Sequence, residues 1–274
     1  MSVAEVWLPP QSAQEIVAGN EKSQPLDEPM YAKARAKAEE ANEQAQRARK
    51  RLQANFPEWS VKAESSSGSP AWELIAKADE WKPDLIVVGS QGRSALGRFF
   101  LGSVAQRVAT EARCSVRVAR GRLDEPGDSV RVIVGLDGSP GSERTIREIA
   151  GRHWPKGSEF RIVVANDPLT PTLAGYLVPG ISKIVDETNQ EDRLWVEKIL
   201  ATASETLRNA GLTVSTRMEQ GDPKRVLVEE AEEWAADCIF VGSTGFSNRL
   251  ERFVLGSVSA SVVARAHCTV EIVR

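Results

Sequence analysis

The sequence has few cysteines and histidines. Its three cysteines, Cys114, Cys238 and Cys268, are scattered, and none belongs to a Cys-x-x-Cys pair. That usage is typical of buried or free thiols in a reducing compartment rather than of a disulfide framework. The two histidines, His153 and His267, lie far from each other and from any cluster of carboxylates. The sequence therefore predicts no metal site.

Long apolar runs and an excess of positive charge are also missing. No apolar run approaches the roughly 20 residues that a membrane-spanning helix needs. The first residues lack the basic start and apolar core of a signal peptide. The formal net charge of −3 gives no support for binding to nucleic acid or to an anionic membrane. We expect a cytoplasmic protein that binds neither nucleic acid nor membrane.

What the sequence does contain is a duplication. From Asp84 it reads DLIVVGSQGRSALGRFFLGSVAQRV, and from Asp237 it reads DCIFVGSTGFSNRLERFVLGSVSASV. The two copies align at an offset of 153 residues as far as Gly92 and Gly245, and at an offset of 154 afterwards. A period of about 150 residues is too long for a solenoid unit and indicates a duplicated domain.

The boundary between the copies lies in a stretch rich in glycine, proline and acidic residues. We therefore predict a first domain over residues 1–121, a linker over 122–128 and a second domain over 129–274.

Each copy alternates strand and helix patterns. The runs DLIVVG and DCIFVG are short, apolar and end in glycine, as expected of strands buried on both faces. Strands separated by helices predict an α/β fold with a doubly wound parallel sheet in each copy. Two long polar stretches, at about residues 30–54 and 186–209, predict helices that form a solvated outer layer.

The last strand of each copy has a different pattern. CSVRVAR and CTVEIVR alternate apolar and polar residues, which indicates one polar face or an edge position. Arg117 and Glu271 occupy equivalent positions with opposite charge. If these strands pair with each other, the two charges would complement each other.

The first copy starts later than the second. The second opens with VRVIVGLDGSPGSERTIREI, a strand, a turn and a helix, whereas the first opens with SVAEVWLPP, which matches the second strand. Three explanations stay open: a gene start placed too far downstream, a fragment, or a truncated domain. The first strand is usually central in a doubly wound sheet, so we favour a clipped start.

A glycine pattern follows the strand in the first copy: Gly89-x-x-Gly92, nine residues, then Gly102-Ser103. Glycine at the end of a strand lets the backbone approach a ligand. A Gly-Ser pair that opens a helix presents free N–H groups and the positive end of the helix dipole to an anion. Ser103 could cap this helix or donate to a phosphate. Neither G-x-x-x-x-G-K-[ST] nor G-x-G-x-x-G occurs, so the pattern differs from the P-loop and the dinucleotide fingerprint.

This pattern, written twice, resembles the universal stress protein family over nearly the whole chain. The resemblance implies two tandem Rossmann-like domains of the adenine nucleotide α-hydrolase type. It implies that they pair through their last strands as an intramolecular pseudo-dimer, which could associate further as a homodimer. It also implies binding of an adenine nucleotide, ATP with or without Mg²⁺, and a role as a nucleotide-dependent sensor or regulator in the stress response.

The family's nucleotide-binding positions can be placed on both copies. In the first copy they are Val6, Gly89, Gln91, Gly92, Gly102, Ser103 and Val104. In the second copy they are Asp137, Ala165, Gly242, Gly245, Gly256 and Ser257. The second loop has ten residues where the first has nine, and Phe246 stands in place of Arg93. We therefore expect ATP at the first loop and leave the second uncertain.

No nucleophile, base and orienting group stand in a recognisable pattern, so we predict no catalytic residue and no enzyme activity. Three interpretations stay open. The chain could be a nucleotide-binding protein of the stress response, a scaffold of the same fold that acts through protein contacts, or a weak ATP hydrolase.

Overall fold

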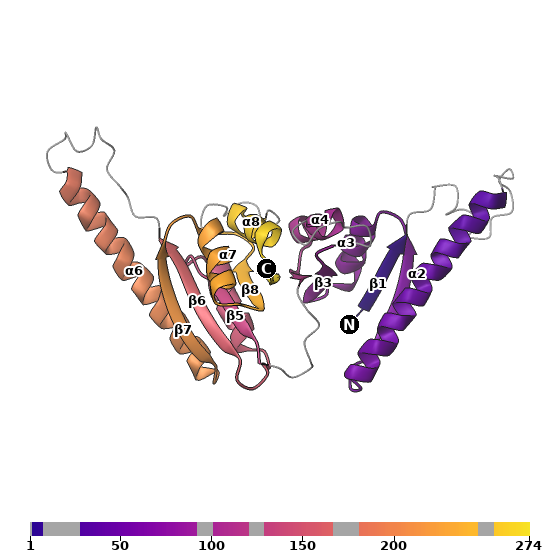
Figure 1. The fold of residues 1–274 in the computed structure, drawn as a ribbon, viewed down its shortest axis with the longest axis horizontal. Coiled ribbons are helices and arrows are strands. Elements are labelled where there is room, and N and C mark those ends of the chain that lie inside the picture. The colour runs from indigo at the N-terminus through magenta and orange to yellow at the C-terminus, as the bar shows by residue number, and fades with distance from the viewer. Residues whose placement is uncertain (1, 8–27, 92–100, 121–128, 167–180, 246–254) are drawn as a thin grey trace. The chain divides into compact units, whose positions relative to one another are not determined.

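The computed structural model describes residues 2–7, 28–91, 101–120, 129–166, 181–245 and 255–274 (Figure 1). The chain divides into two compact units, Met1–Lys82 and Pro83–Arg274. The first copy of the duplication therefore contributes residues to both units, and the second copy lies wholly in the second unit. None of the helices in the described ranges combines the length and apolar character needed to cross a membrane.

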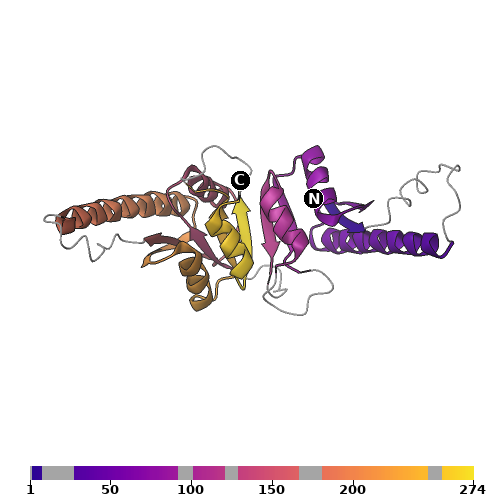
Figure 2. The same cartoon turned by 90° about the horizontal axis from the view of Figure 1, so that it is seen from above.

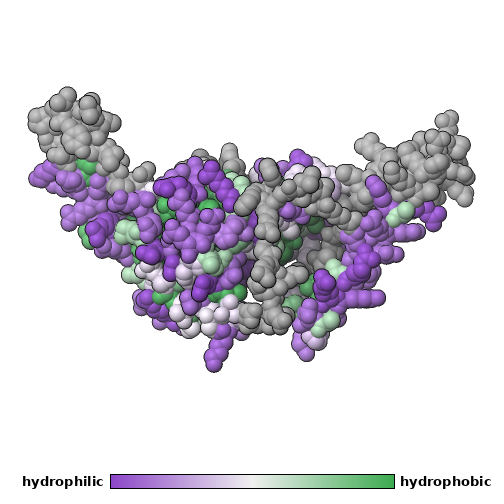
Figure 3. All heavy atoms as spheres, viewed as in Figure 1, coloured by the Kyte–Doolittle hydropathy of each residue, from purple (hydrophilic) through white to green (hydrophobic). Residues whose placement is uncertain are grey.

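In its described residues, the first unit holds two strands and two helices. They are β1 (Ser2–Trp7), α2 (Glu28–Asn55), β2 (Lys62–Ser67) and α3 (Pro70–Trp81). The strands β1 and β2 run parallel and form a sheet of their own. The helix α2 is rich in alanine, glutamate, lysine and arginine, which favour helix formation. Over residues 35–55 of this helix, Ala41 and Ala45 are the buried apolar residues. The surface of the helix is mainly hydrophilic (Figure 3).

The second unit is built on a seven-stranded sheet with the order β3-β4-β9-β8-β5-β6-β7. Its strands are β3 (Leu85–Gly89), β4 (Ser115–Ala119), β5 (Arg131–Gly135), β6 (Glu159–Asn166), β7 (Thr213–Gln220), β8 (Cys238–Gly242) and β9 (Thr269–Val273). Its helices are α4 (Ser103–Glu111), α5 (Pro140–Ala150), α6 (Ile181–Asn209), α7 (Pro223–Glu233) and α8 (Ser257–Arg265). This mainly parallel α/β architecture confirms the predicted fold class.

Among the strands that the structure describes, one antiparallel pair joins the two copies within this sheet. Strand β4 of the first copy lies beside β9 of the second (Figure 2). In the register of this pair, Arg117 is opposite Glu271. The Arg117 guanidinium donates to the Glu271 carboxylate, with 2.6 Å between Nη2 and Oε2. The register therefore agrees with the charge complement expected from the sequence.

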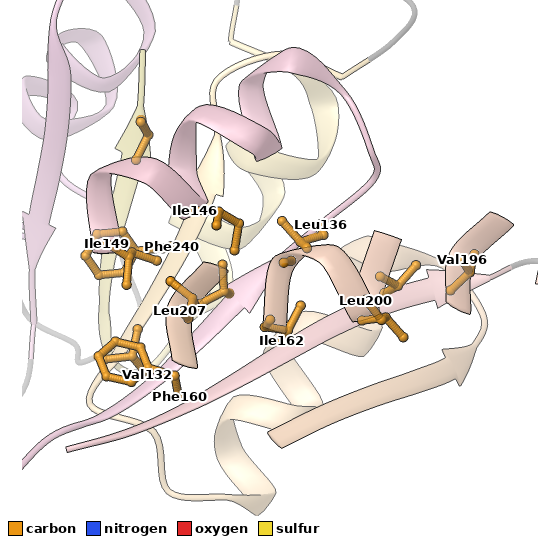
Figure 4. Packing of buried hydrophobic residues seen from close by; sticks show 14 residues of the cluster. Val132, Leu136, Ile146, Ile149, Phe160, Ile162, Val196, Leu200, Leu207 and Phe240 are labelled. Carbon is orange, nitrogen blue, oxygen red and sulfur yellow. The ribbon is translucent and has the colours of Figure 1, made fainter. Parts of the chain in front are cut away.

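The main core lies where α5 and α6 cover the sheet (Figure 4). Val132, Phe160, Ile162 and Phe240 project from the strands and are fully buried. The helices supply the facing side chains Ile146, Ile149, Leu200 and Leu207. Each such side chain stabilises the fold by roughly 1.5–3 kcal/mol relative to an exposed one. Helix α6 is thus only partly the solvated outer layer that its polar composition suggests.

The two copies differ at the position of β5. In the second copy β5 pairs with β6 on one side and with β8 on the other. In the described part of the first copy no strand occupies that place. The strands β1 and β2 consequently form a separate sheet, and β3 ends the strand order of the larger one. This division agrees with the sequence comparison, in which the given part of the first copy has no counterpart of VRVIVGLDGSPGSERTIREI.

Candidate functional site

The candidate site lies at the carboxyl ends of β5, β6 and β8. The chain moves outward through β5, β6 and β7 in one direction and through β8 and β9 in the other. The strand order therefore reverses between β5 and β8, and ligands of doubly wound sheets bind at such a reversal. Asp137 follows β5, Ala165 lies near the end of β6 and Gly242 ends β8. Three of the predicted positions are thus at one edge of the sheet.

The turn after β5 fixes the Asp137 carboxylate. The N–H of Ser139 donates to Asp137 Oδ1 at 2.9 Å. Ser139 also caps helix α5, since its hydroxyl accepts from the N–H of Ser142 at 3.3 Å. A Cβ added at Gly245 would lie 2.7 Å from Asp137 Oδ2. The glycine loop after β8 therefore runs directly against the second oxygen of this carboxylate.

Two glycines allow β8 to approach the start of α5. A Cβ at Gly242 would lie 2.9 Å from the carbonyl carbon of Gly141 and 3.1 Å from the nitrogen of Ser142. A Cβ at Gly141 would in turn lie 2.8 Å from the carbonyl oxygen of Thr244. Real Cβ atoms do not approach backbone this closely, so both positions need glycine. Their contact brings the loop and Asp137 together.

The far end of the glycine loop returns to β8. The N–H of Gly256 donates to the carbonyl of Ser243 at 2.7 Å, and the Ser259 hydroxyl donates to the carbonyl of Gly242 at 2.6 Å. Gly256 is the N-cap residue of α8 and makes no side-chain cap, so Ser257 is the first helical residue. The Ser257 side chain is exposed. The first turn of α8 therefore presents backbone N–H groups and a hydroxyl at the site.

The first copy repeats the end of this loop. The N–H of Gly102 donates to the carbonyl of Ser90 at 2.7 Å, as Gly256 does to Ser243. Gly102 is the N-cap of α4 and has no side-chain cap. Of the two roles expected for Ser103, capping is therefore excluded, because Ser103 is the first helical residue. Its exposed side chain leaves donation to a phosphate as the remaining role.

The other predicted residues of the first copy are not brought together in the same way. Val6 lies in β1 of the first unit, opposite Ser66, whereas Gly89, Gln91 and Val104 lie in the second unit. Gln91 and Val104 are half-buried. The predicted residue Gly92 lies outside the described residues, as do Arg93 and Phe246, whose exchange distinguishes the two loops.

Comparison with known proteins agrees with this geometry. The sequence profile described as the universal stress protein family matches residues 16–120 and again residues 130–274. The chain belongs to the universal stress protein family. A Staphylococcus aureus USA300 protein described as a universal stress protein is 31% identical over 145 residues, which are 52% of this chain and 82% of that protein.

Solved structures show the same fold. A universal stress protein from Archaeoglobus fulgidus aligns with a TM-score of 0.63 at 20% identity, over 100% of this chain and 85% of that chain. A structure of a universal stress protein from Pseudomonas aeruginosa aligns with a TM-score of 0.55 at 16% identity, over 99% and 92% of the two chains. At these identities the likeness is one of fold.

One contact in this universal stress protein was missed from the sequence. Gly138 has φ of +72°, and a Cβ there would lie 2.6 Å from Trp195 and from Ile199 of α6. Helix α6 therefore packs on the turn that holds Asp137, and the Trp195 side chain is 45% exposed beside it. The sequence pattern that indicates this contact is the apolar pair Trp195 and Ile199, which lie four residues apart on a helix of mainly polar composition.

The cysteines lie apart from this chemistry. All three are free thiols. Burial raises the pKa of the Cys238 thiol, and it raises the pKa of the Cys268 thiol to about 12. Both thiols are therefore protonated at neutral pH and are poor nucleophiles or metal ligands. Within the part of the chain that the structure describes, no group of three or more His, Cys, Asp or Glu residues could hold a metal ion.

Proposed function

We propose that this universal stress protein binds an adenine nucleotide, ATP in particular, at the carboxyl edge of β5, β6 and β8, and acts as a nucleotide-dependent sensor or regulator. The observation that carries the proposal is the approach of the glycine loop to Asp137, where a Cβ at Gly245 would lie 2.7 Å from Oδ2. It places a carboxylate beside a loop that leads to a helix N-terminus. A ligand with both hydrogen-bond donors and negative charge suits this pair.

The charge of each group in the site indicates which part of the nucleotide it would bind. The first turn of α8 offers backbone N–H groups and the positive end of the helix dipole, which suit the phosphates. The Asp137 carboxylate would repel a phosphate, so it is suited to accept from a ribose hydroxyl or the adenine amino group. Ala165, half-buried at the end of β6, is small enough to leave room for the base. Mg²⁺ would bind through the phosphates.

The second copy supports this site better than the first. Asp137, Ala165, Gly242 and Gly245 lie in one unit, on neighbouring strands and their loops. The first-copy positions divide between two units, and the described part of that copy has no counterpart of β5. Binding of ATP at the first loop stays a prediction, as does further association into a homodimer.

We also propose the domain organisation that accompanies this function. The chain is interpreted as two domains, residues 1–121 and 129–274, which pair within one chain through their last strands. The β4–β9 pairing and the Arg117–Glu271 ion pair support that interpretation.

The test is calorimetric titration of the full chain with ATP, together with native mass spectrometry of the freshly purified protein. Asp137→Asn should weaken ATP binding by about tenfold or more, because it removes a charged hydrogen-bond acceptor. Asp186→Asn, an exposed carboxylate on α6, is the matched control and should leave affinity unchanged.

Two further variants assign the site to a copy. Gly256→Val and Gly102→Val change equivalent N-cap residues of α8 and α4. The proposal expects ATP binding at the second-copy site to be lost in Gly256→Val and kept in Gly102→Val. The reverse result would place the site at the first loop. No binding by the unmodified chain at millimolar ATP would favour the scaffold interpretation.

A further inference from the structure

A buried glutamate between the two copies is the feature that the proposed function does not use. Glu271 of β9 is fully buried. Arg117 of β4 donates to its Oε2 atom, through Nε at 2.7 Å and through Nη2 at 2.6 Å. Arg152 donates to both carboxylate oxygens, through Nη1 to Oε2 at 3.0 Å and through Nη2 to Oε1 at 2.5 Å. Because a buried charge is costly unless it is paired, this carboxylate and the two guanidinium groups hold one another in place.

Arg152 connects this cluster to helix α5. It follows the C-cap residue of α5, and its Nη2 atom also lies 3.7 Å from Oε2 of Glu148 in the same helix. At the other end of α5, Ser139 donates its N–H to Asp137 and its hydroxyl to the carbonyl of Thr244. The cluster therefore fixes one end of the helix whose other end holds the turn and the glycine loop of the candidate site.

Phe240 connects the same cluster to strand β8. The guanidinium carbons of Arg117 and Arg152 lie 5.9 Å and 5.3 Å from the centre of the Phe240 ring. A cation at about 6 Å or less from the centre of an aromatic ring is attracted to the face of that ring. Phe240 is fully buried, and its strand ends at Gly242, which packs on the backbone of Gly141 in α5. The cluster thus contacts both elements whose close approach forms the candidate site.

The charges at this junction are specific to the pairing of two different copies. Arg117 and Glu271 are equivalent residues at an offset of 154, and the antiparallel register sets them opposite each other. The same residue in both copies would set two like charges against each other, which is destabilising. The glutamate belongs to the second copy, which carries the proposed site, and Arg117 belongs to the first. The second copy therefore depends on the first for one of the two cations that hold Glu271.

We propose that Arg117 of the first copy is a positioning residue for the nucleotide site of the second copy. It acts through Glu271, which fixes Arg152 and thereby the position of α5 relative to the end of β8. This inference rests on the proposed function and names the regulation of that same site. Because such a coupling is reciprocal, ATP at the second copy in turn strengthens the pairing of β4 with β9.

The experiment compares ATP binding by Arg117→Gln and by the unmodified full chain in calorimetric titrations, at a temperature where circular dichroism shows that both are folded. We expect the substitution to weaken binding by about tenfold, a typical size for the coupling of two sites. Arg117→Lys should retain most of the affinity, because its ammonium group still offers a charged donor to Glu271. If Arg117 contributed to stability alone, the affinity of the folded chain would not change.

The matched control is Arg47→Gln, because the ion pair of Arg47 with Glu43 also belongs to the first copy but is exposed. The ATP affinity of this variant should equal that of the unmodified chain. Arg152→Gln is a second test variant and should weaken ATP binding to a similar extent, so that one variant still decides if the other does not fold. The proposal is overturned if either folded test variant binds ATP as tightly as the unmodified chain. It is also overturned if Arg117→Lys loses as much affinity as Arg117→Gln.

Hydrogen exchange of the nucleotide-free chain separates this inference from the proposed function. Failure of the unmodified chain to bind ATP would contradict the proposed function, and exchange then decides whether Arg117 positions α5. Without nucleotide, the amides of residues 137–145 should exchange faster in Arg117→Gln than in the unmodified chain, because the turn and the start of α5 are held less firmly. The control Arg47→Gln should not differ from the unmodified chain. Equal exchange over residues 137–145 in Arg117→Gln and the unmodified chain would overturn the inference, whether or not ATP binds.

Discussion

At the scale of the residue, the two copies offer a matched pair of glycines. Gly242 packs against the backbone of Gly141, whereas Gly89, its counterpart, has only an ordinary contact at 3.6 Å. We expect Gly242→Ala to lower the free energy of unfolding by about 1–3 kcal/mol, because the added methyl overpacks the start of α5. Gly89→Ala should change it by less than about 0.5 kcal/mol, as a surface substitution does. Urea denaturation of both variants measures the difference, and equal effects would contradict the packing described here.

This pair of glycines also shows which kind of contact cannot be predicted from the sequence. The glycine spacing, the apolar runs and the opposite charges of Arg117 and Glu271 are all legible in the sequence, and they led to the site and the strand pairing. The reason for Gly242 is a backbone contact with Gly141, a residue far from it in the chain. Such contacts depend on how elements pack, and no local pattern encodes them.

At the scale of the element, helix α6 was the least well predicted. Its composition suggested a solvated layer, yet Leu200 and Leu207 join the core and Trp195 packs on the turn beside Asp137. Polar residues dominate this helix and conceal the narrow apolar stripe that faces the sheet. A long helix that is half-buried differs little in composition from one that is mostly exposed.

The contact of α6 with the turn can be separated from backbone strain. Gly138 and Gly211 have similar φ angles of +72° and +80°, but a Cβ at Gly211 meets no atom within 4 Å. Gly211→Ala should therefore lower the free energy of unfolding by only about 1–2 kcal/mol, the strain of a left-handed conformation at a residue with a Cβ. Gly138→Ala should cost about 1–3 kcal/mol more, because its methyl also collides with Trp195 and Ile199. Thermal denaturation compares the two, and only Gly138→Ala should weaken ATP binding. Equal losses of stability in the two variants would mean that Trp195 and Ile199 of α6 move aside without cost.

At the scale of the whole molecule, an ion cluster connects the junction of the two copies to the candidate site. Glu271 of β9 is fully buried, and its carboxylate accepts from Arg117 of β4 and from Arg152, which donates at 3.0 Å. Arg152 follows α5, the helix whose N-cap residue, Ser139, donates its N–H to Asp137. Burial lowers the pKa of the Arg152 guanidinium, but hydrogen bonding and attraction from Glu271 outweigh this effect and raise its pKa above the usual value. The Arg152 guanidinium is therefore charged at neutral pH.

Removing the shared carboxylate should consequently loosen the junction of the copies. We expect Glu271→Ala to lower the free energy of unfolding by about 3–5 kcal/mol, because it leaves two guanidinium groups without their buried partner. Glu143→Ala is the control: its ion pair with Arg147 is exposed and spans 4.0 Å, so its loss should cost less than about 1 kcal/mol. Hydrogen exchange should rise in β4 and β9 of Glu271→Ala before it rises in β6, since the cluster lies at their ladder. Uniform exchange across the sheet would instead mean that the junction opens only when the whole unit unfolds.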